Sequence, residues 1–69
     1  MKVIKNLKEH RIEKQLLQKE VAMESNISKS FYSLIESGHR SCSMNTASKI
    51  CEVLDLDLNE FYNLLKKNN

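Results

Sequence analysis

The chain of 69 residues contains 41% hydrophobic and 29% charged residues and carries a net charge of +2, which indicates one small globular domain rather than a disordered chain. A domain of this size buries only about 60% of the surface that its unfolded chain exposes, so there is little room for an enzymatic cleft. With no proline and one glycine, the composition favours an all-helical domain over a sheet, which needs more turn residues.

Cysteine usage and the N-terminal residues indicate where the protein resides. Cys42 and Cys51 are nine positions apart and do not form a metal-type pair. Small secreted domains are usually rich in disulfides, and this one is not. The first residues lack a signal-peptide core, and no stretch is long and apolar enough to span a membrane. We therefore expect a cytoplasmic protein without membrane contact.

The charge is unevenly distributed along the chain. Residues 1–49 contain nine Lys or Arg and five Asp or Glu, a net +4, whereas residues 50–69 contain two and four, a net −2. Such polarity can orient a domain toward a polyanion, although an ordinary mixed surface explains the charges as well.

Hydrophobic periodicity and capping residues predict five helices, joined by connections of two to six residues that suit a compact bundle. The first is expected at about 3–14, with Val3, Leu7 and Ile12 among its apolar positions. Its apolar stripe is thin, and Arg11 follows Leu7 by four residues, on the face that should be buried.

The second helix is expected at about 18–25, with Val21 and Ala22 facing inward and Leu16 packing just ahead of it. It is too short to persist alone and needs tertiary support. The third is expected to begin after Ser28, a good N-cap, and to end at Gly38, placed where a left-handed residue belongs.

The fourth helix is expected to start near Ser43, again an N-cap type, and the fifth near Asp57, with Glu60 completing a capping box. In the fourth helix, apolar residues at helical spacing predict a core-facing side formed by Met44, Ala47, Ile50, Cys51 and Leu54. In the fifth helix, the apolar face is supplied by Leu58, Phe61, Tyr62 and Leu65.

The central part of the chain contains two short helices joined by the turn SNIS, with the small Ala22 facing inward on the first and Tyr32 and Ile35 on the second. A small residue there lets two helices cross closely at a steep angle, as a helix-turn-helix requires. Asn26 occupies a turn position expected to need positive φ, which asparagine tolerates, and Ile27 packs behind it.

The run QKEVAMESNISKSFYSLIESG resembles the helix-turn-helix of the Cro/repressor-type (XRE-like) DNA-binding family. The similarity covers about residues 3–62, including KICEVLDLDLNEFY downstream. It implies an all-α, lambda-repressor-like fold, a compact five-helix bundle over residues 1–69 that forms a single DNA-binding domain with its helix-turn-helix at about 18–37. The matching residues are Arg11, Gln18, Ala22, Ile27, Ser28, Ile35, Glu36 and Gly38.

Arg11 and Glu36 lie on helix faces that periodicity predicts to be buried, where either charge alone would be costly. A planar guanidinium can satisfy the carboxylate, and the resemblance implies such a pair. It would be structural, and removing one partner of a buried pair costs about 3–5 kcal/mol. Two independent surface charges are the alternative.

The residues expected to point outward from the third helix lie in the major groove in the proteins that the chain resembles. Lysine can donate to guanine or to phosphate, serine can bond to either base type, and leucine can contact a thymine methyl. The set lacks the Gln or Arg pairs that give strong bidentate readout, so DNA shape is expected to contribute. A solvated helix face is the alternative. These base-contact candidates are Lys29, Ser30, Ser33 and Leu34.

Candidates for phosphate contact flank that helix. Gln18 matches the family position at the start of the second helix, where backbone N–H groups and the amide can meet a phosphate. In the loop HRSCSMN, Arg40 is the best cation for a phosphate, whereas the serines can serve simply as caps and turns. The candidates are Gln18, Lys19, Ser28, His39, Arg40, Ser41, Ser43 and Asn45.

Three residues depart from the family pattern. Leu17 stands where a Ser or Thr cap is usual, which loses about 1 kcal/mol and one phosphate contact. Gln15 replaces a common glycine, and Cys42 replaces a common proline in the loop. We expect none of them to break the fold.

No catalytic, metal or cofactor site is predicted, because the chain has no Gly-rich phosphate loop, no metal-ligand spacing and no nucleophile motif. His10 and His39 are expected to be solvated or near phosphate, Cys51 in the core and Cys42 in a loop. We therefore expect a protein that is not an enzyme, with no cofactor and no small-molecule ligand.

The leading prediction is sequence-specific binding to double-stranded DNA as a small transcriptional regulator, most simply a repressor acting as a homodimer on a palindromic operator. The dimer contact is expected on the fifth helix, at about 58–67. The alternatives are a protein-interaction module, such as the antitoxin of a toxin–antitoxin pair, and a restriction-modification controller protein. Against an antitoxin, only four residues follow Leu65 to wrap a partner. The dimer-contact residues, expected to be exposed, are Leu58, Phe61, Leu64 and Leu65.

Overall fold

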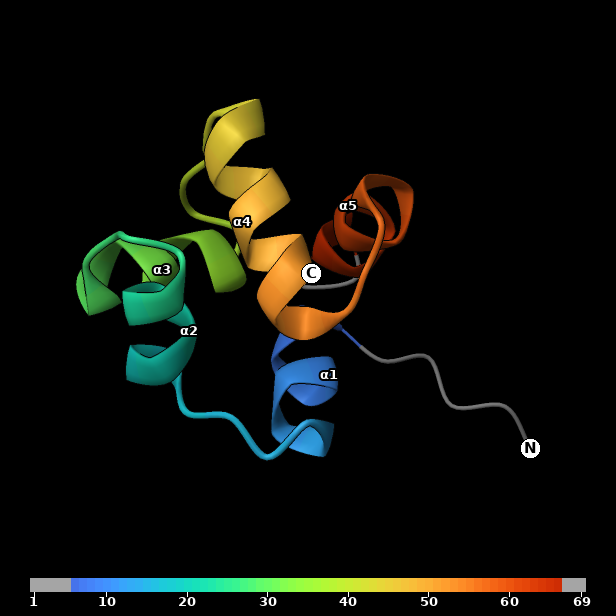
Figure 1. Ribbon diagram of the computed structural model, residues 1–69. Coiled ribbons are helices and arrows are strands. Elements are labelled where there is room, and N and C mark those ends of the chain that lie inside the picture. Colours follow the sequence, from blue (N-terminus) through green and yellow to red (C-terminus); the bar gives the residue numbers. More distant parts are fainter. Residues whose placement is uncertain (1–5, 67–69) are drawn as a thin grey trace.

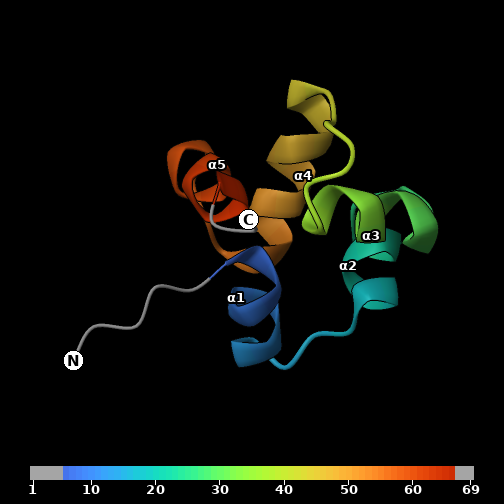
Figure 2. The ribbon, with the colours of Figure 1, turned by 180° about the vertical axis from the view of Figure 1, so that it is seen from behind.

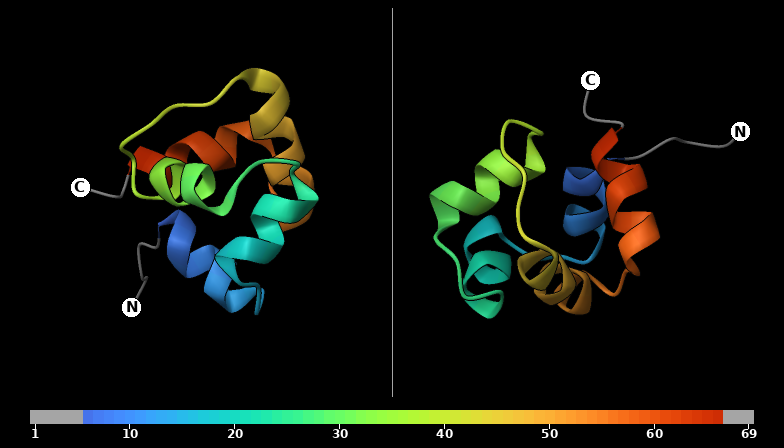
Figure 3. Two further views of the ribbon diagram at one scale, coloured as in Figure 1. Left: turned by 90° about the vertical axis from the view of Figure 1, so that its left-hand side faces the viewer. Right: turned by 90° about the horizontal axis from the view of Figure 1, so that it is seen from above.

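The computed structural model describes residues 6–66, which form five helices and no strand. Figure 1 and the view from above in Figure 3 show that α4 lies between the α2–α3 pair on one side and α5 with α1 on the other. The predicted all-helical helix-turn-helix fold is confirmed. The helices are α1 (Leu7–Glu13), α2 (Gln18–Glu24), α3 (Lys29–Glu36), α4 (Met44–Leu54) and α5 (Leu58–Lys66).

The first helix begins later than predicted because Asn6 caps it. The side-chain oxygen of Asn6 accepts from the backbone N–H of Glu9 at 3.0 Å, and the Glu9 carboxylate accepts from the backbone N–H of Asn6 at the same distance. Such a capping box satisfies two N–H groups that have no partner within the helix. Val3 lies outside the described residues, so the expected apolar role of that residue stays a prediction.

The caps predicted for α3, α4 and α5 are present. The hydroxyl oxygens of Ser28 and Ser43 accept from backbone N–H groups three residues later, at 3.0 and 3.2 Å. Asp57 and Glu60 form a reciprocal capping box, with distances of 2.7 and 3.0 Å. At α2, Leu17 supplies no side-chain cap, as predicted, and its own N–H instead donates to the Glu20 carboxylate at 2.7 Å.

Left-handed residues end the helices. Gly38 has φ 85° one residue beyond the cap of α3, and Asn26 has φ 63° in the helix-turn-helix turn, as predicted for both. Gln15 also has a positive φ, 62°, at the position where the resemblance suggested that glycine is common. A side chain with a Cβ costs about 1–2 kcal/mol in this conformation, so the glutamine places strain between α1 and α2.

One core joins all five helices. Burial of Val21, Ala22, Tyr32 and Ile35 confirms the inward faces predicted for α2 and α3, and Leu16 and Ile27 pack against that core. The side chains of the main cluster are at most 5% exposed. None of the helices in the described part of the chain is long and apolar enough to cross a membrane. The cluster consists of Leu7, Val21, Ala22, Tyr32, Ile35, Ala47, Ile50, Cys51, Leu54 and Phe61.

Three expectations about apolar residues are wrong. Ile12 and Met44 are 53% and 60% exposed, because each lies on the solvent side of its helix although the spacing matched a core stripe. Phe61, expected to be exposed at a dimer contact, is fully buried and meets the edge of Tyr62 with ring centroids 5.3 Å apart. A second copy of the chain therefore cannot contact Phe61 without unpacking the core.

The sequence suggested that His10 is solvated or near phosphate, but the structure shows it in a contact with another helix. Its side chain is half-buried, and its Nε2 lies 2.8 Å from the carbonyl oxygen of Leu54, the last residue of α4. This contact requires Nε2 to carry a proton, because a carbonyl oxygen can only accept. The imidazole thus satisfies one of the carbonyls left without a partner at the end of α4.

The left-handed backbone at Gln15 makes Gln15→Gly a stabilising substitution. Glycine removes the steric cost of positive φ but adds entropy to the unfolded chain, so we expect the free energy of unfolding to rise by about 0.5–1 kcal/mol. Urea denaturation followed by circular dichroism measures this change.

The matched control is Lys14→Gly, because Lys14 has φ −79° and an ordinary right-handed conformation. That substitution is expected to lower stability. Equal effects of the two glycine substitutions would contradict a strained backbone at Gln15.

Candidate nucleic-acid interface

The third helix buries one face and presents the other. Tyr32, Ile35 and Glu36 are at most 3% exposed, whereas Leu34 is 41% exposed. Lys29 and Ser30 are also exposed, and Ser33 is half-buried. The helix therefore carries the four residues predicted to face outward on a single side, with Ser33 at the margin.

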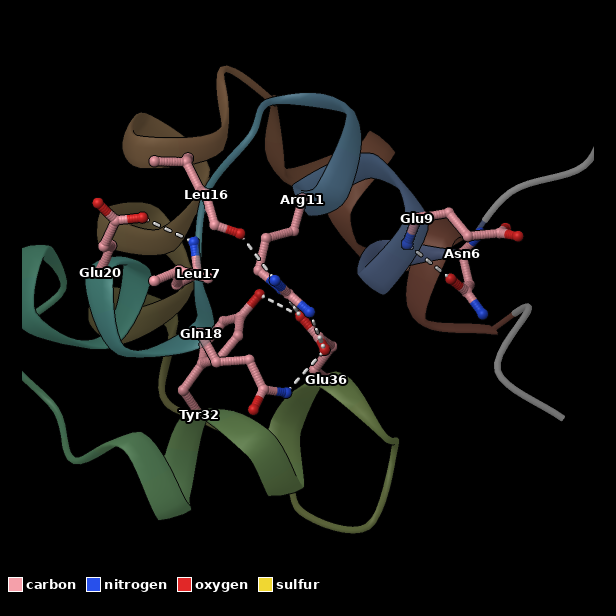
Figure 4. A network of polar contacts seen from close by, with 9 residues as sticks. All are labelled: Asn6, Glu9, Arg11, Leu16, Leu17, Gln18, Glu20, Tyr32 and Glu36. Carbon is pink, nitrogen blue, oxygen red and sulfur yellow. Dashed lines mark hydrogen bonds and ion pairs between the residues drawn. The ribbon is translucent and has the colours of Figure 1, made fainter.

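A network of polar contacts holds the buried face of α3 in place (Figure 4). Glu36 Oε2 accepts from Arg11 Nε at 2.7 Å and from the Tyr32 hydroxyl at 2.8 Å. Glu36 Oε1 accepts from Gln18 Nε2 at 2.9 Å and from Arg11 Nη2 at 3.3 Å. The remaining arm of the Arg11 guanidinium, Nη1, donates to the Leu16 carbonyl at 2.7 Å. The predicted pair of Arg11 and Glu36 is confirmed, and it extends further than predicted.

This network joins three helices and the connection between two of them. Arg11 comes from α1, Leu16 from the connection that follows, Gln18 from the start of α2, and Tyr32 and Glu36 from α3. Since the carboxylate and the guanidinium are both buried, losing any donor leaves part of a charge without a partner. The network therefore fixes the orientation of α3 relative to α1 and α2.

The same contacts set the protonation of the groups involved. Burial raises the pKa of Glu36, but hydrogen bonds from Arg11, Gln18 and Tyr32 and the charge of Arg11 outweigh it, so the pKa lies below its ordinary value. Burial, followed by the charge of Glu36, raises the pKa of Tyr32 and keeps its hydroxyl protonated as a donor. The hydrogen bond to Glu36 raises the pKa of Arg11.

Gln18, predicted to contact phosphate, is half-buried and gives one amide N–H to Glu36. A primary amide has a second N–H and a carbonyl oxygen, so this structural contact leaves groups able to meet a phosphate. The phosphate contact of Gln18 stays a prediction, while its role in holding Glu36 is a finding that the sequence did not indicate.

The segment that follows α3 turns back over the end of the helix and then leads to α4 (Figure 2). The backbone N–H groups of His39 and Arg40 both donate to the Leu34 carbonyl, at 2.9 and 3.2 Å. The Ser37 hydroxyl donates to the same carbonyl at 3.1 Å and lies 2.8 Å from His39 Nδ1. Since the hydroxyl has one proton and gives it to the Leu34 carbonyl, Nδ1 of the exposed His39 donates to the hydroxyl oxygen.

Arg40 contacts an aromatic ring of α3. Its guanidinium carbon lies 6.0 Å from the ring centroid of Phe31, within the range of a cation–π contact. Phe31 itself is half-buried and packs against the core. The exposed guanidinium therefore lies beside the ring of an α3 residue.

The other predicted phosphate-contact residues lie on the surface. Ser28 and Ser43 act as helix caps, the structural alternative raised for the serines, and Ser43 also donates to the Thr46 hydroxyl at 3.1 Å. Their hydroxyl oxygens are therefore already engaged. Exposed candidates without such a capping role are Lys19, His39, Arg40, Ser41 and Asn45.

The described residues contain two free cysteines with raised thiol pKa values and no cluster of metal-ligating side chains. Burial raises the pKa of the Cys42 and Cys51 thiols, so both stay protonated near neutral pH, and both are free. Within residues 6–66, no group of three or more His, Cys, Asp or Glu side chains is arranged to hold a metal ion.

The pH dependence of stability tests the Glu36 network. Because the folded-state pKa of Glu36 lies below the ordinary value of 4.5, its carboxylate stabilises the fold above that value. The contribution is lost as the pH falls through the lowered folded-state pKa. Glu36→Gln is expected to cost about 3–5 kcal/mol near neutral pH and to flatten this part of the pH profile, measured by urea denaturation.

Tyr32→Phe is the milder variant for the case in which Glu36→Gln does not fold. It removes one hydrogen bond to a charged acceptor, at a cost of about 1.5–3 kcal/mol, and keeps the ion pair. Glu9→Gln, at the exposed cap of α1, is the control for general effects of removing a carboxylate. A wild-type profile that Glu36→Gln leaves unchanged below pH 5 would contradict the assigned role of Glu36.

Comparison with known proteins agrees with this geometry. The family model described as "Helix-turn-helix" matches residues 7–61, most of the chain. The chain is also 40% identical over 56 residues to the uncharacterized HTH-type transcriptional regulator YqaF of Bacillus subtilis (strain 168), covering 81% of this chain and 74% of that protein. With the helix pair, the buried ion pair and the presented face of α3 in place, the chain belongs to the XRE-type helix-turn-helix family of DNA-binding transcriptional regulators.

Proposed function

We propose that the protein binds a specific double-stranded DNA sequence by placing the exposed face of α3 in the major groove. The supporting observation is the arrangement of that face, on which Lys29, Ser30 and Leu34 project from a helix that the Glu36 network holds rigidly. The cation of Lys29 suits guanine, and the hydroxyl of Ser30 can bond to either base type. The apolar side chain of Leu34 suits the methyl group of thymine.

The residues that flank α3 are suited to phosphate. Arg40 lies beside the C-terminal end of α3, positioned on Phe31, while Lys19 and Gln18 lie near the start of α2. Backbone contacts on both sides of a reading helix set its register on the duplex, and base contacts then supply the specificity. The remaining candidates for contact with DNA phosphates are Ser28, His39, Ser41, Ser43 and Asn45, of which Ser28 and Ser43 would have to combine this contact with their capping hydrogen bonds.

The regulatory outcome that we propose is repression in the cytoplasm. A small domain bound to an operator excludes other proteins from the same stretch of DNA, which needs no catalytic group and no cofactor. The amount of protein bound then depends on its concentration and on the salt-dependent affinity for DNA.

We further propose that the operator is palindromic and is bound by a homodimer. One recognition helix reads only a few base pairs, and a two-fold symmetric dimer doubles that number. The surface that supports this proposal is an open hollow of about 350 Å³ beside α5. Its lining combines apolar side chains with three basic ones and has no acid. In a symmetric dimer the same lining would face itself without opposite charges, so the contact would have to be made by the apolar groups. It is lined by Ile35, Gly38, His39, Arg40, Ser41, Cys42, Tyr62, Leu65 and Lys66.

Of the predicted dimer residues, Leu58, Leu64 and Leu65 are half-buried and remain candidates, with the exposed Tyr62 beside them. The hollow is continuous with the segment that carries Arg40. A dimer formed there would therefore place two phosphate-contacting segments near the two-fold axis.

Two substitutions test the assigned DNA-binding face, using a duplex selected from a random pool. Lys29→Ala is expected to weaken binding by about 1 kcal/mol and to relax the preference for one base pair. Arg40→Ala is expected to weaken binding to selected and mixed-sequence duplexes alike and to lower the salt slope by about 1. Fluorescence anisotropy at several salt concentrations measures both effects.

Lys14→Ala is the matched control, because Lys14 is exposed and lies 3.5 Å from the carboxylate of Asp55, in the acidic part of the chain. It should bind like the wild type. If Lys29→Ala and Arg40→Ala also bind like the wild type, the DNA-binding face has been assigned wrongly.

Tyr62→Arg tests the dimer. A further cation in a hollow that already contains His39, Arg40 and Lys66 should disfavour association, so sedimentation should show a shift toward monomer. Ile12→Arg, an exposed apolar residue of α1 outside the hollow, is the control and should leave the dimer intact. A wild-type protein that remains monomeric even on a selected duplex would contradict the proposal.

A further inference from the structure

A second hollow, of about 390 Å³, lies between the first three helices, and its lining is dominated by cations. Lys8 comes from α1, Lys19 from α2 and Lys29 from α3, so three ammonium groups from separate helices share one concave site. Arg11, Leu17 and Gln18 complete the lining, and none of the six residues is acidic.

The charge of these lysines is not compensated within the part of the chain that the structure describes. Arg11 is neutralised by Glu36, but Lys8, Lys19 and Lys29 form no ion pair with residues 6–66. The Glu20 carboxylate of α2 is engaged elsewhere, because it accepts a hydrogen bond from the backbone N–H of Leu17. Three positive charges around one hollow repel one another, and an anion placed there would relieve that repulsion.

The stability of the helices does not account for these lysines. Lys8 and Lys19 are the second residues of α1 and α2, and Lys29 is the first residue of α3. A cation in the first turn of a helix is mildly unfavourable, because the helix dipole is positive at that end. The helix dipole therefore does not favour a lysine at any of these three positions, yet all three line the same hollow.

We infer that this hollow binds one phosphate group of the DNA backbone, with Lys8 and Lys19 as its cationic ligands and the free N–H of the Gln18 amide as an additional donor, while Lys29 at its edge is left to the base contact. The inference rests on the proposed function and extends it to α1. Since Lys29 also begins the recognition helix, the bound phosphate lies next to the base pairs that α3 reads. Lys8, in a helix that otherwise serves the core, thereby becomes a DNA-contacting residue.

The salt dependence of binding to a mixed-sequence duplex tests the role of Lys8. One phosphate neutralised in the hollow contributes about 0.9 to the slope of log K against log salt concentration. Because Lys8 and Lys19 share that phosphate, Lys8→Gln is expected to lower the slope by part of this amount, and the double variant Lys8→Gln/Lys19→Gln by about 0.9. Lys19→Gln should do the same, while Lys14→Gln, from the end of the same helix as Lys8, should leave the slope unchanged. Lys8 is exposed, so circular dichroism should show an unaltered fold.

The outcomes separate this inference from the proposed function. A wild-type protein that binds no duplex overturns both. If the wild type binds and Lys19→Gln lowers the slope but Lys8→Gln does not, the function stands and the lysine hollow is overturned as a phosphate site. A free phosphate is distinguished by titration with inorganic pyrophosphate at constant ionic strength. Saturable binding that depends on Lys8, combined with an unchanged DNA slope for Lys8→Gln, would overturn the assignment to the DNA backbone.

Discussion

The carboxylate of Glu36 is the contact on which the arrangement of the first three helices depends. It accepts hydrogen bonds from Arg11, Gln18 and Tyr32, and the guanidinium of Arg11 continues to the Leu16 carbonyl. A buried carboxylate is tolerated only with such partners, so each helix that supplies a donor must keep its place. The face of α3 opposite this network is consequently presented to solvent in one orientation, which a DNA-reading surface requires.

A domain this small has a limited apolar core, and its helices are short. Each of them depends on its ends as much as on its buried face, as the capping boxes at Asn6 and Asp57 and the serine caps illustrate. The strained backbone at Gln15 and the missing side-chain cap at Leu17 lie in the same connection, between α1 and α2. That connection is held by Arg11, whose guanidinium bonds the Leu16 carbonyl, so the polar network also compensates for unfavourable local choices.

Much of the fold could be predicted from residue patterns, because the strongest signals were local. Ser28 and Gly38 mark the ends of α3 through their capping preferences, and Asn26 marks the turn because asparagine tolerates positive φ. The pairing of Arg11 with Glu36 was predictable since each charge fell on an apolar stripe and could not be buried alone. The predicted burial of Met44, the first residue of α4, failed because helical spacing defines a stripe but does not show which of its residues other helices cover.

The parts of the site that could not be predicted depend on contacts distant in the chain. Tyr32 precedes Glu36 by four residues and so shares its helix face, a signal that could have indicated their hydrogen bond. Nothing local could have placed Gln18 against Glu36, His10 against Leu54, or Lys8 and Lys29 around one hollow. Phe61 was misjudged for a similar reason, because the half-exposed and the buried sides of α5 both carry large apolar residues.

The most direct test of the central claim is a titration of the ¹⁵N-labelled protein with a duplex selected from a random pool, followed by two-dimensional NMR. If α3 reads the DNA and its flanking segments hold the backbone, the largest amide shifts should occur at 29–34, 39–43 and the start of α2. The amides at the C-terminal end of α4 should change little. Shifts concentrated on the 50–60 region, with the amides of α3 unchanged, would contradict the account.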